Sequence, residues 1–376
     1  MTTTDPQTHS LADRLRERIR RDGPISFHDW MSAALYDEHE GYYCRRDIVR
    51  RGRLGDYRTA PERTSLFAAT FARYFAKLFR ELGSPERWTI IEVGAGFGEF
   101  AAGVLQTLQS RYRSVFAATR YLIDEHTEDG RDRAAANLTG FESVYEFCRS
   151  SERNLKFPVG IIFSNELIDA FPVYRIVKSG GILRSQSVGL DAQAEFIWIE
   201  QDLEAAVAQY CGRANIQLAE GQITEINLGA DRFIAHAAEL IDDGFIITVD
   251  YGDEREALLT DPHRRQGTLR AAYRHQISSD VLQQPGRRDL TATIDWTQLR
   301  EAGEKAGLSV VSHQGLDRFL MAEGLLDELE EVARDVTEAE RAQLCVGARE
   351  MIMPGGMASS FQVLVQRKGP LEVLVS

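Results

Sequence analysis

A glycine-rich turn between a strand and a helix constrains this chain of 376 residues more than any other feature. The apolar run at residues 88–93 has the length and composition of a strand buried on both faces. Three glycines follow at alternate positions in the pattern Glu92-x-Gly94-x-Gly96-x-Gly98, and a helical pattern comes directly after them. A strand, a glycine turn and a helix in this order predict an α/β fold with a doubly wound, Rossmann-like sheet.

The same turn has the chemistry of a nucleoside site. Glycines let a ligand lie against bare backbone, and the first amides of the following helix point toward it. The spacing differs from the Gly-x-Gly-x-x-Gly pattern of dinucleotide sites. A carboxylate before the first glycine suits the ammonium group of S-adenosylmethionine (SAM). We predict SAM as the cofactor, with Glu92, Gly94, Gly96 and Gly98 at its amino-acid end. A glycine turn without a ligand is the alternative.

A second predicted strand, at about residues 120–124, ends in two acids. In a doubly wound sheet an acid at this position lies beside the ribose and accepts hydrogen bonds from its hydroxyl groups. Glu125 is the first candidate for this role and Asp124 the second. The alternative for Asp124 is that it caps the next helix. A nicotinamide cofactor would use the same acid, so this position supports a nucleoside rather than SAM in particular.

Polar residues also follow a third apolar strand, which begins near Gly160. Such a strand lies at the switch point of the sheet, where the transferred methyl group would lie. Asn165, Glu166 and Asp169 are therefore candidates to hold or orient the methyl acceptor, and Asn165 is also assigned to the cofactor. The alternative is a capped helix start, with Asn165 as the cap.

The other segments predict three regions along the chain. They are an N-terminal helical prelude at 1–82, a core at 83–260 with a β insertion at about 174–228, and a substrate-side region at 261–376. The third region holds a polar connection, a helical insertion and a final strand that folds back beside the strand at Leu308. Long polar connections are often lids or substrate loops. Within this one, His275 is a candidate base or acceptor contact.

Composition limits the class of protein. The 43% of hydrophobic and 27% of charged residues are typical of a soluble globular protein. The formal net charge of −13 argues against general nucleic-acid binding. The first residues have neither the apolar core of a signal peptide nor the arginines of a transit peptide, and no apolar run is long enough for a membrane span. We expect a cytoplasmic enzyme.

The cysteines give no metal-binding pattern. Cys44, Cys148, Cys211 and Cys345 lie far apart in the sequence. Neither a Cys-x-x-Cys pair nor a zinc spacing is present. We expect reduced structural thiols and no metal site.

Several further short motifs occur in a specific order and spacing. They are Glu40-Gly41-Tyr42-Tyr43, Gly55-Asp56-Tyr57-x-Thr59-Ala60-Pro61-Glu62, Asn165-Glu166-Leu167-Ile168-Asp169-Ala170-Phe171-Pro172, Asp250-Tyr251-Gly252, Gly267-Thr268-Leu269-Arg270, Pro285-Gly286-x-x-Asp289-Leu290-Thr291 and Pro354-x-x-Met357 with Phe361-Gln362-Val363-Leu364. With these motifs and the glycine turn, the chain resembles the MidA family of class I SAM-dependent methyltransferases from about Ile25 to Leu364.

This resemblance implies a class I methyltransferase fold with an inserted α/β substrate region. Mitochondrial members of the family are complex I assembly factors that methylate an arginine of a respiratory subunit. An arginine acceptor is cationic, so carboxylates must hold it. Glu166 and Asp169 are the nearest candidates, and Asp56 is a candidate from the prelude.

Some residues depart from the family pattern. In the glycine turn, Ala95 and Phe97 replace the proline and the arginine that the family usually has. After Pro61-Glu62, Arg63-Thr64-Ser65 replaces the usual Ile-Ser-Gln, and Thr293 occupies a position where the family often has a histidine. Two alternatives to a protein arginine methyltransferase follow. One is a small-molecule O-, N- or C-methyltransferase of secondary metabolism, and the other is an assembly factor with low turnover. The expected partner is a protein or small-molecule acceptor, with neither nucleic acid nor membrane, and a homodimer is a possible assembly.

Overall fold

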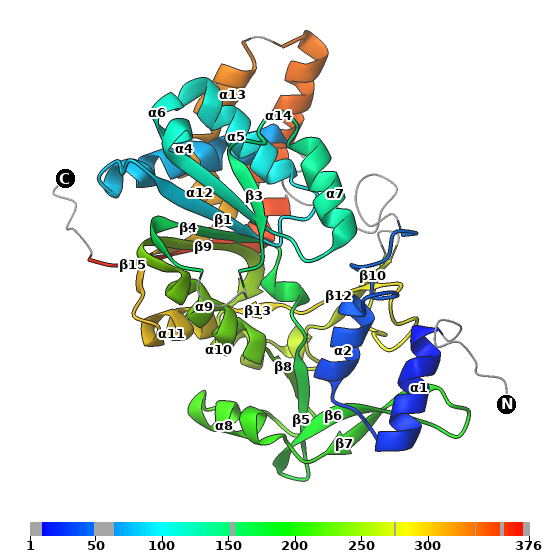
Figure 1. Ribbon diagram of the computed structural model, residues 1–376. Helices are drawn as coiled ribbons and strands as arrows, with labels where there is room; N and C mark the ends of the chain where they lie inside the picture. Colours follow the sequence, from blue (N-terminus) through cyan, green and yellow to red (C-terminus); the bar gives the residue numbers. More distant parts are fainter. Residues whose placement is uncertain are drawn as a thin grey trace. The chain divides into compact units, whose positions relative to one another are not determined.

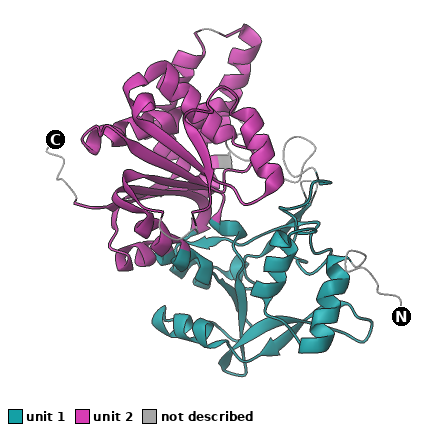
Figure 2. Ribbon diagram, in the orientation of Figure 1, with its two compact units in different colours: residues 1–57, 168–232, 253–298 teal, residues 58–167, 233–252, 299–376 magenta. Residues whose placement is uncertain are grey.

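The computed structural model describes residues 10–48, 64–150, 155–273, 276–334, 336–353 and 357–370. The chain forms two compact units, and each unit gathers three segments that alternate along the sequence (Figure 2). Unit 1 consists of residues 1–57, 168–232 and 253–298, and unit 2 of residues 58–167, 233–252 and 299–376. The three regions predicted from the sequence are consecutive stretches of the chain. Each compact unit instead combines segments that are far apart in the sequence.

A twisted sheet forms the centre of unit 2 (Figure 1). Its strands lie in the order β14-β15-β9-β4-β1-β2-β3. They are β1 (Trp88–Val93), β2 (Thr119–Asp124), β3 (Tyr145–Cys148), β4 (Phe157–Asn165), β9 (Ile241–Asp253), β14 (Ser309–Gly315) and β15 (Phe361–Lys368). Strands β3, β2, β1, β4 and β9 pair in parallel, and β15 is antiparallel to both β9 and β14. The order reverses at β1, and open α/β sheets bind ligands at the carboxyl ends of the strands at such a point.

Helices cover this sheet on both faces. Helices α4 and α5 lie on one side of it, and α9 and α11 lie on the other (Figure 1). The helices that accompany the sheet are α4 (Ser65–Glu81), α5 (Glu99–Arg111), α6 (Arg113–Ala118), α7 (Glu128–Asn137), α9 (Leu228–Leu240), α11 (Trp296–Lys305), α12 (Leu316–Ala322), α13 (Leu325–Val332) and α14 (Glu338–Ile352). None of the helices in the described residues is long and apolar enough to cross a bilayer.

Phenylalanines from two helices pack on the central strand β4. The ring of Phe163 on β4 stacks on Phe100 of α5, with centroids 4.3 Å apart, and meets Phe71 of α4 at 5.1 Å. All three side chains are buried. These contacts fix α5, which follows the glycine turn, against the strand that ends at the predicted acceptor residues.

We expect Phe163→Ala to lower the free energy of unfolding by about 3–5 kcal/mol, because the truncation leaves a cavity between two helices and the sheet. Urea denaturation followed by circular dichroism measures this change. Phe147→Ala, on the exposed part of β3, is the control and should change stability by less than about 1 kcal/mol. An equal effect of both substitutions would contradict this description of the core.

The structure confirms the predicted arrangement of the last strands and refines the helices between them. β15 pairs with β14, and α12, α13 and α14 lie between these strands in sequence. Within the predicted helical insertion, Gly324 has a left-handed φ of 93° and separates α12 from α13. Strand β3 is not predicted by the sequence, because its four residues are partly exposed and lack an apolar run.

Unit 1 is built on two antiparallel sheets. The first has the order β7-β6-β5-β8 and confirms the β insertion predicted at about 174–228. The second has the order β11-β10-β12 and lies in the segment predicted only as a polar connection. The strands of these sheets are β5 (Tyr174–Ser179), β6 (Ile182–Leu190), β7 (Phe196–Gln201), β8 (Ile223–Ile226), β10 (Arg270–Tyr273), β11 (Gln276–Ser278) and β12 (Asp289–Thr291). The two-residue strand β13 (Ile294–Asp295) belongs to neither sheet, and the helices are α1 (Leu11–Asp22), α2 (Phe27–Tyr36), α8 (Ala205–Arg213) and α10 (Arg255–Thr260).

The four cysteines are free thiols in very different surroundings. Burial raises the pKa of the Cys211 thiol to about 11, whereas Cys345 is exposed. Because the thiolate is the reactive form, we expect iodoacetamide at pH 8 to label Cys345 and to leave Cys211 unlabelled in the folded protein. Peptide mass spectrometry measures both sites. Equal labelling of the two thiols before unfolding would contradict the buried position of Cys211.

Candidate cofactor and acceptor site

Three glycines carry the chain from β1 into α5 through left-handed backbone. Gly94, Gly96 and Gly98 have φ angles of 74°, 57° and 74°. A Cβ atom on Gly94 would lie 2.7 Å from Cδ1 of Leu167, and one on Gly98 would lie 2.9 Å from Cβ of Ala134. Side chains at these two positions are therefore excluded both by the backbone angles and by the neighbouring residues.

Gly98 is also the residue that precedes the first turn of α5. It has no side chain with which to cap that turn, so no capping side chain competes with a ligand for the first backbone N–H groups of the helix. The N-terminus of a helix favours an anionic group. The carboxylate of SAM is such a group, and the turn therefore fits the amino-acid end of this cofactor.

The strand register brings the three strand ends of the predicted site together. Val93, the last residue of β1, pairs with Asp124 of β2 on one side and with Ser164 of β4 on the other. The backbone N–H of Gly94 donates to the carbonyl of Asp124 at 2.9 Å. The residues that come next, Glu125 and Asn165, therefore lie at the same sheet edge as the glycine turn.

Glu92 is a buried carboxylate on β1 with a defined partner on β2. The hydroxyl of Tyr121 donates to its Oε2 at 2.7 Å. Burial and the Glu92 carboxylate raise the pKa of Tyr121 well above its ordinary value, so the phenol keeps its proton. A carboxylate fixed two residues before the glycine turn is in the correct part of the sheet to attract the ammonium group of SAM.

Glu125 contacts the glycine turn directly. Its Oε2 accepts a hydrogen bond from the backbone N–H of Gly96 at 2.9 Å. Its Oε1 accepts from the backbone N–H of Thr127 at 2.8 Å and from the Thr127 hydroxyl at 2.6 Å. The structure thus joins two features that the sequence analysis predicted separately, the glycine turn and the acid at the end of β2.

Asp124 has a different environment. It is fully buried, and its Oδ2 accepts from the backbone N–H of Ser150 at 3.2 Å and from the Ser150 hydroxyl. The cap of α7 is Thr127, so the suggestion that Asp124 caps this helix is wrong. These bonds hold Ser150, two residues after the end of β3, against β2. Glu125 remains the first candidate for the ribose.

Asn165 and Glu166 end β4 in an unusual conformation. Glu166 has a left-handed φ of 51°, and its N–H donates to the carbonyl of Val249 on β9 at 2.9 Å. The Nδ2 of Asn165 donates to Oε1 of Glu166 at 3.2 Å, and the buried Oδ1 of Asn165 has no hydrogen-bond partner among the described residues. A left-handed residue other than glycine costs about 1–2 kcal/mol, and such strain is concentrated at functional sites.

Of the other predicted acceptor residues, the structure describes Asp169. Asp169 is buried in unit 1, where its backbone carbonyl accepts from the N–H of Ala292 at 2.9 Å. Asp56 and His275 lie outside the described residues. Their roles stay predictions. Tyr121 and Thr127 were not among the predicted site residues, although a threonine two positions after Glu125 is a typical helix cap.

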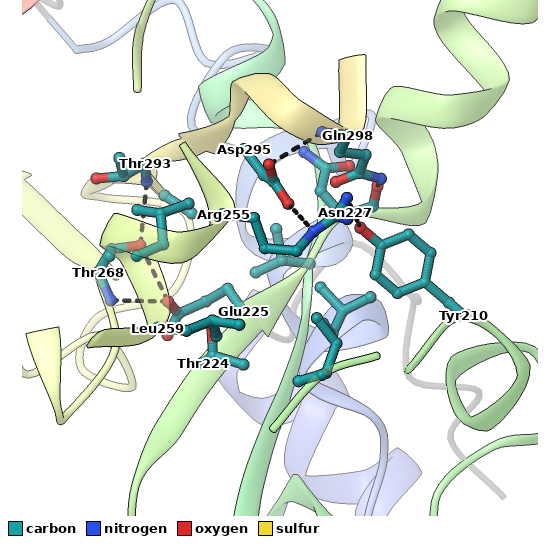
Figure 3. A pocket seen from close by; sticks show the side chains of 15 residues that line it. Tyr210, Thr224, Glu225, Asn227, Arg255, Leu259, Thr268, Thr293, Asp295 and Gln298 are labelled. Carbon is teal, nitrogen blue, oxygen red and sulfur yellow. Dashed lines mark hydrogen bonds and ion pairs between the residues drawn. The ribbon is translucent and has the colours of Figure 1, made fainter. Parts of the chain in front are cut away.

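Unit 1 contains a polar cavity of its own (Figure 3). Arg255 and Asp295 form an ion pair of 2.8 Å there, and the backbone N–H of Thr268 donates to Glu225 at 2.7 Å. A Cβ atom on Gly267 would lie 2.1 Å from Oε1 of Glu225. This packing explains why a glycine and a threonine occupy positions 267 and 268: together they enclose the buried carboxylate of Glu225. Burial raises the pKa of this carboxyl group. None of the described site candidates lines the cavity.

Comparisons with known proteins identify the family of this chain. The family model "Putative S-adenosyl-L-methionine-dependent methyltransferase" matches residues 70–314. The Drosophila melanogaster "Protein arginine methyltransferase NDUFAF7 homolog, mitochondrial" is 26% identical over 326 residues, which cover 79% of this chain and 71% of that protein. The Mus musculus "Protein arginine methyltransferase NDUFAF7, mitochondrial" is 26% identical over 396 residues, which cover 94% of this chain and 84% of that protein.

A solved structure gives the same result for the whole fold. A COG1565 superfamily member from Burkholderia thailandensis, bound to S-adenosyl-homocysteine, matches with a TM-score of 0.83 and 26% identity. The match covers 98% of this chain and 95% of that one. The glycine turn, the open helix start and the acid at the end of β2 fit the same ligand here, and SAM is the cofactor, as predicted. The chain therefore belongs to the MidA family of SAM-dependent methyltransferases.

Proposed function

We propose that this methyltransferase modifies an arginine side chain of a protein. The observation that carries the proposal is Glu166, a carboxylate in left-handed backbone at the end of the strand beside the glycine turn. The names of the Drosophila and mouse relatives support it, because both are called protein arginine methyltransferases.

Glu166 supplies what a guanidinium acceptor needs. The group is cationic at neutral pH and a poor nucleophile, and a carboxylate binds two of its N–H groups and directs the third nitrogen. SAM supplies an electrophilic methyl group on a sulfonium. As the nitrogen–carbon bond forms, the carbon–sulfur pair returns to sulfur and the guanidinium loses one proton. Glu166 accepts that proton and passes it to water, while exclusion of bulk water strengthens these contacts.

Asp169, Asp56 and His275 are proposed as further acceptor contacts. Each carries a side chain that can bind a guanidinium or receive its proton. A cytoplasmic location and a homodimer are also part of the proposal. Fractionation of cells and light scattering of the purified protein, respectively, test these two points.

A small-molecule acceptor is the second candidate, since Ala95 and Phe97 depart from the family pattern in the glycine turn. The third reading, a fold with little turnover, would be favoured by a pocket that Phe97 blocks or by the absence of methyl transfer to any acceptor. The ring of Phe97 instead lies 4.6 Å from the guanidinium carbon of Arg133, and its carbonyl accepts from Nδ2 of Asn137 at 2.8 Å. These contacts hold Phe97 against α7, which favours an active enzyme.

The test is transfer of the labelled methyl group of SAM into a lysate of the source organism, with products separated by size. We expect label in one or a few protein bands, and acid hydrolysis of these bands should release methylated arginine. Label in small molecules alone would replace the proposal with the second candidate. If no label is transferred, binding of S-adenosylhomocysteine (SAH) to the pure protein is measured next. Binding would indicate that the lysate lacks the acceptor, and no binding would indicate a fold that no longer catalyses.

A further inference from the structure

We propose that Thr127 is a positioning residue, which fixes the Glu125 carboxylate so that a single oxygen of it reads the ribose of the cofactor. Thr127 acts through Glu125 and need not touch the ligand. The inference rests on the assignment of Glu125 to the ribose hydroxyl groups. It adds the contact that holds this carboxylate in one orientation and so lets it bind one ribose hydroxyl in preference to the other.

Thr127 occupies one oxygen of the carboxylate completely. The backbone N–H and the side-chain hydroxyl of Thr127 both donate to Oε1 of Glu125, at 2.8 Å and 2.6 Å. The hydroxyl oxygen accepts in turn from the backbone N–H of Gly130 at 3.0 Å. Since a hydroxyl has one proton, the bond from Gly130 leaves that proton directed at Glu125.

The other oxygen of the carboxylate is only partly used. Oε2 of Glu125 accepts from the backbone N–H of Gly96 at 2.9 Å. A carboxylate has about four lone-pair sites, so the three donors found in the described part of the chain leave about one site, on Oε2. This site lies at the glycine turn. One ribose hydroxyl can bond there directly, and the carboxylate cannot turn to offer a second oxygen without losing both bonds to Thr127.

Gly130 makes room for this arrangement. A Cβ atom at Gly130 would lie 2.5 Å from the Thr127 hydroxyl oxygen and 2.7 Å from the Glu125 carboxyl carbon. Glycine inside a helix is about 1 kcal/mol less favourable than alanine. The first turn of α7 therefore keeps an unfavourable residue whose lack of a side chain lets the carboxylate pack against the helix.

The test compares the dissociation constants of SAH and of its 2′-deoxy and 3′-deoxy analogues by calorimetry. The wild-type protein should bind one deoxy analogue at least about tenfold more weakly than SAH, and the other analogue within about threefold of SAH. Thr127→Val, which keeps the shape and removes the hydroxyl, should reduce this tenfold preference to about threefold or less. Thr127→Ser should retain it, and Gly130→Ala should lose it as Thr127→Val does.

The outcomes separate the two claims. A merely structural role for Thr127 would weaken all three ligands equally and leave the preference unchanged, and that result in a folded Thr127→Val protein would overturn the proposal. If the wild type has no preference between SAH and either analogue, the assignment of Glu125 to the ribose is wrong. Thermal denaturation of each variant shows whether it is folded, and Gly130→Ala provides the answer if the valine variant is not, because an unchanged preference in that variant would also overturn the proposal.

Discussion

Glu125→Ala is expected to weaken the binding of SAH by about tenfold to a hundredfold. A hydrogen bond to a charged group contributes about 1.5–3 kcal/mol, and the variant loses the bond from the ribose. It also leaves the N–H groups of Gly96 and Thr127 without their acceptor, which loosens the glycine turn. Titration calorimetry with SAH measures the change.

Glu142→Ala provides the matched control for this prediction. It removes one carboxylate from an exposed position in the segment that follows α7, and we expect it to leave the dissociation constant within about twofold of the wild-type value. If Glu125→Ala also bound SAH with the wild-type constant, the assignment of the acid at the end of β2 would be refuted.

Glu166→Gln is expected to reduce the kcat of methyl transfer by about a hundredfold or more, because a neutral amide neither pairs with a guanidinium nor accepts its proton. The affinity for SAH should change by less than about threefold, since the role of Glu166 is at the acceptor. The assay follows label from SAM into the protein band that the wild type modifies. Glu239→Gln, an equal change at an exposed position of α9, should retain full activity.

Glu166→Gly extends the same test to stability. Glycine adopts left-handed backbone without the penalty that Glu166 bears at its φ of 51°. We expect this variant to unfold at a free energy about 1 kcal/mol higher than the wild type while it loses methyl transfer. Full activity of Glu166→Gln, or clear destabilisation by Glu166→Gly, would show that the residue serves the fold rather than the acceptor.

The sequence predicted the sheet edge well because its signals are local. An apolar run followed by glycines or acids marks a strand end, and parallel strands bring their carboxyl ends to one edge. Glu92, the glycine turn, Glu125 and Asn165 are together for that reason. The contact between Glu125 and Gly96 follows from the register of β1 and β2.

Other features depend on contacts between distant segments and could not be read locally. The bond from Ser150 to Asp124 joins the residues after β3 to the end of β2, and β3 itself has no apolar run. The pairing that makes β10, β11 and β12 a sheet joins short polar strands. The role of Gly267 also could not be predicted from the local sequence, because the carboxylate that packs against it belongs to Glu225 on β8. Helix α9, strand β9 and helix α10 separate the two residues in the sequence.

The most direct test of the account is a crystal structure of this protein with SAH. We expect a ribose hydroxyl at about 2.5–3.0 Å from Oε2 of Glu125, with Oε1 still bonded to Thr127. We also expect the amino-acid end of the ligand against Gly94 to Gly98, with its ammonium group toward Glu92. A ribose bound by other residues, with Glu125 turned away from it, would contradict the central claim.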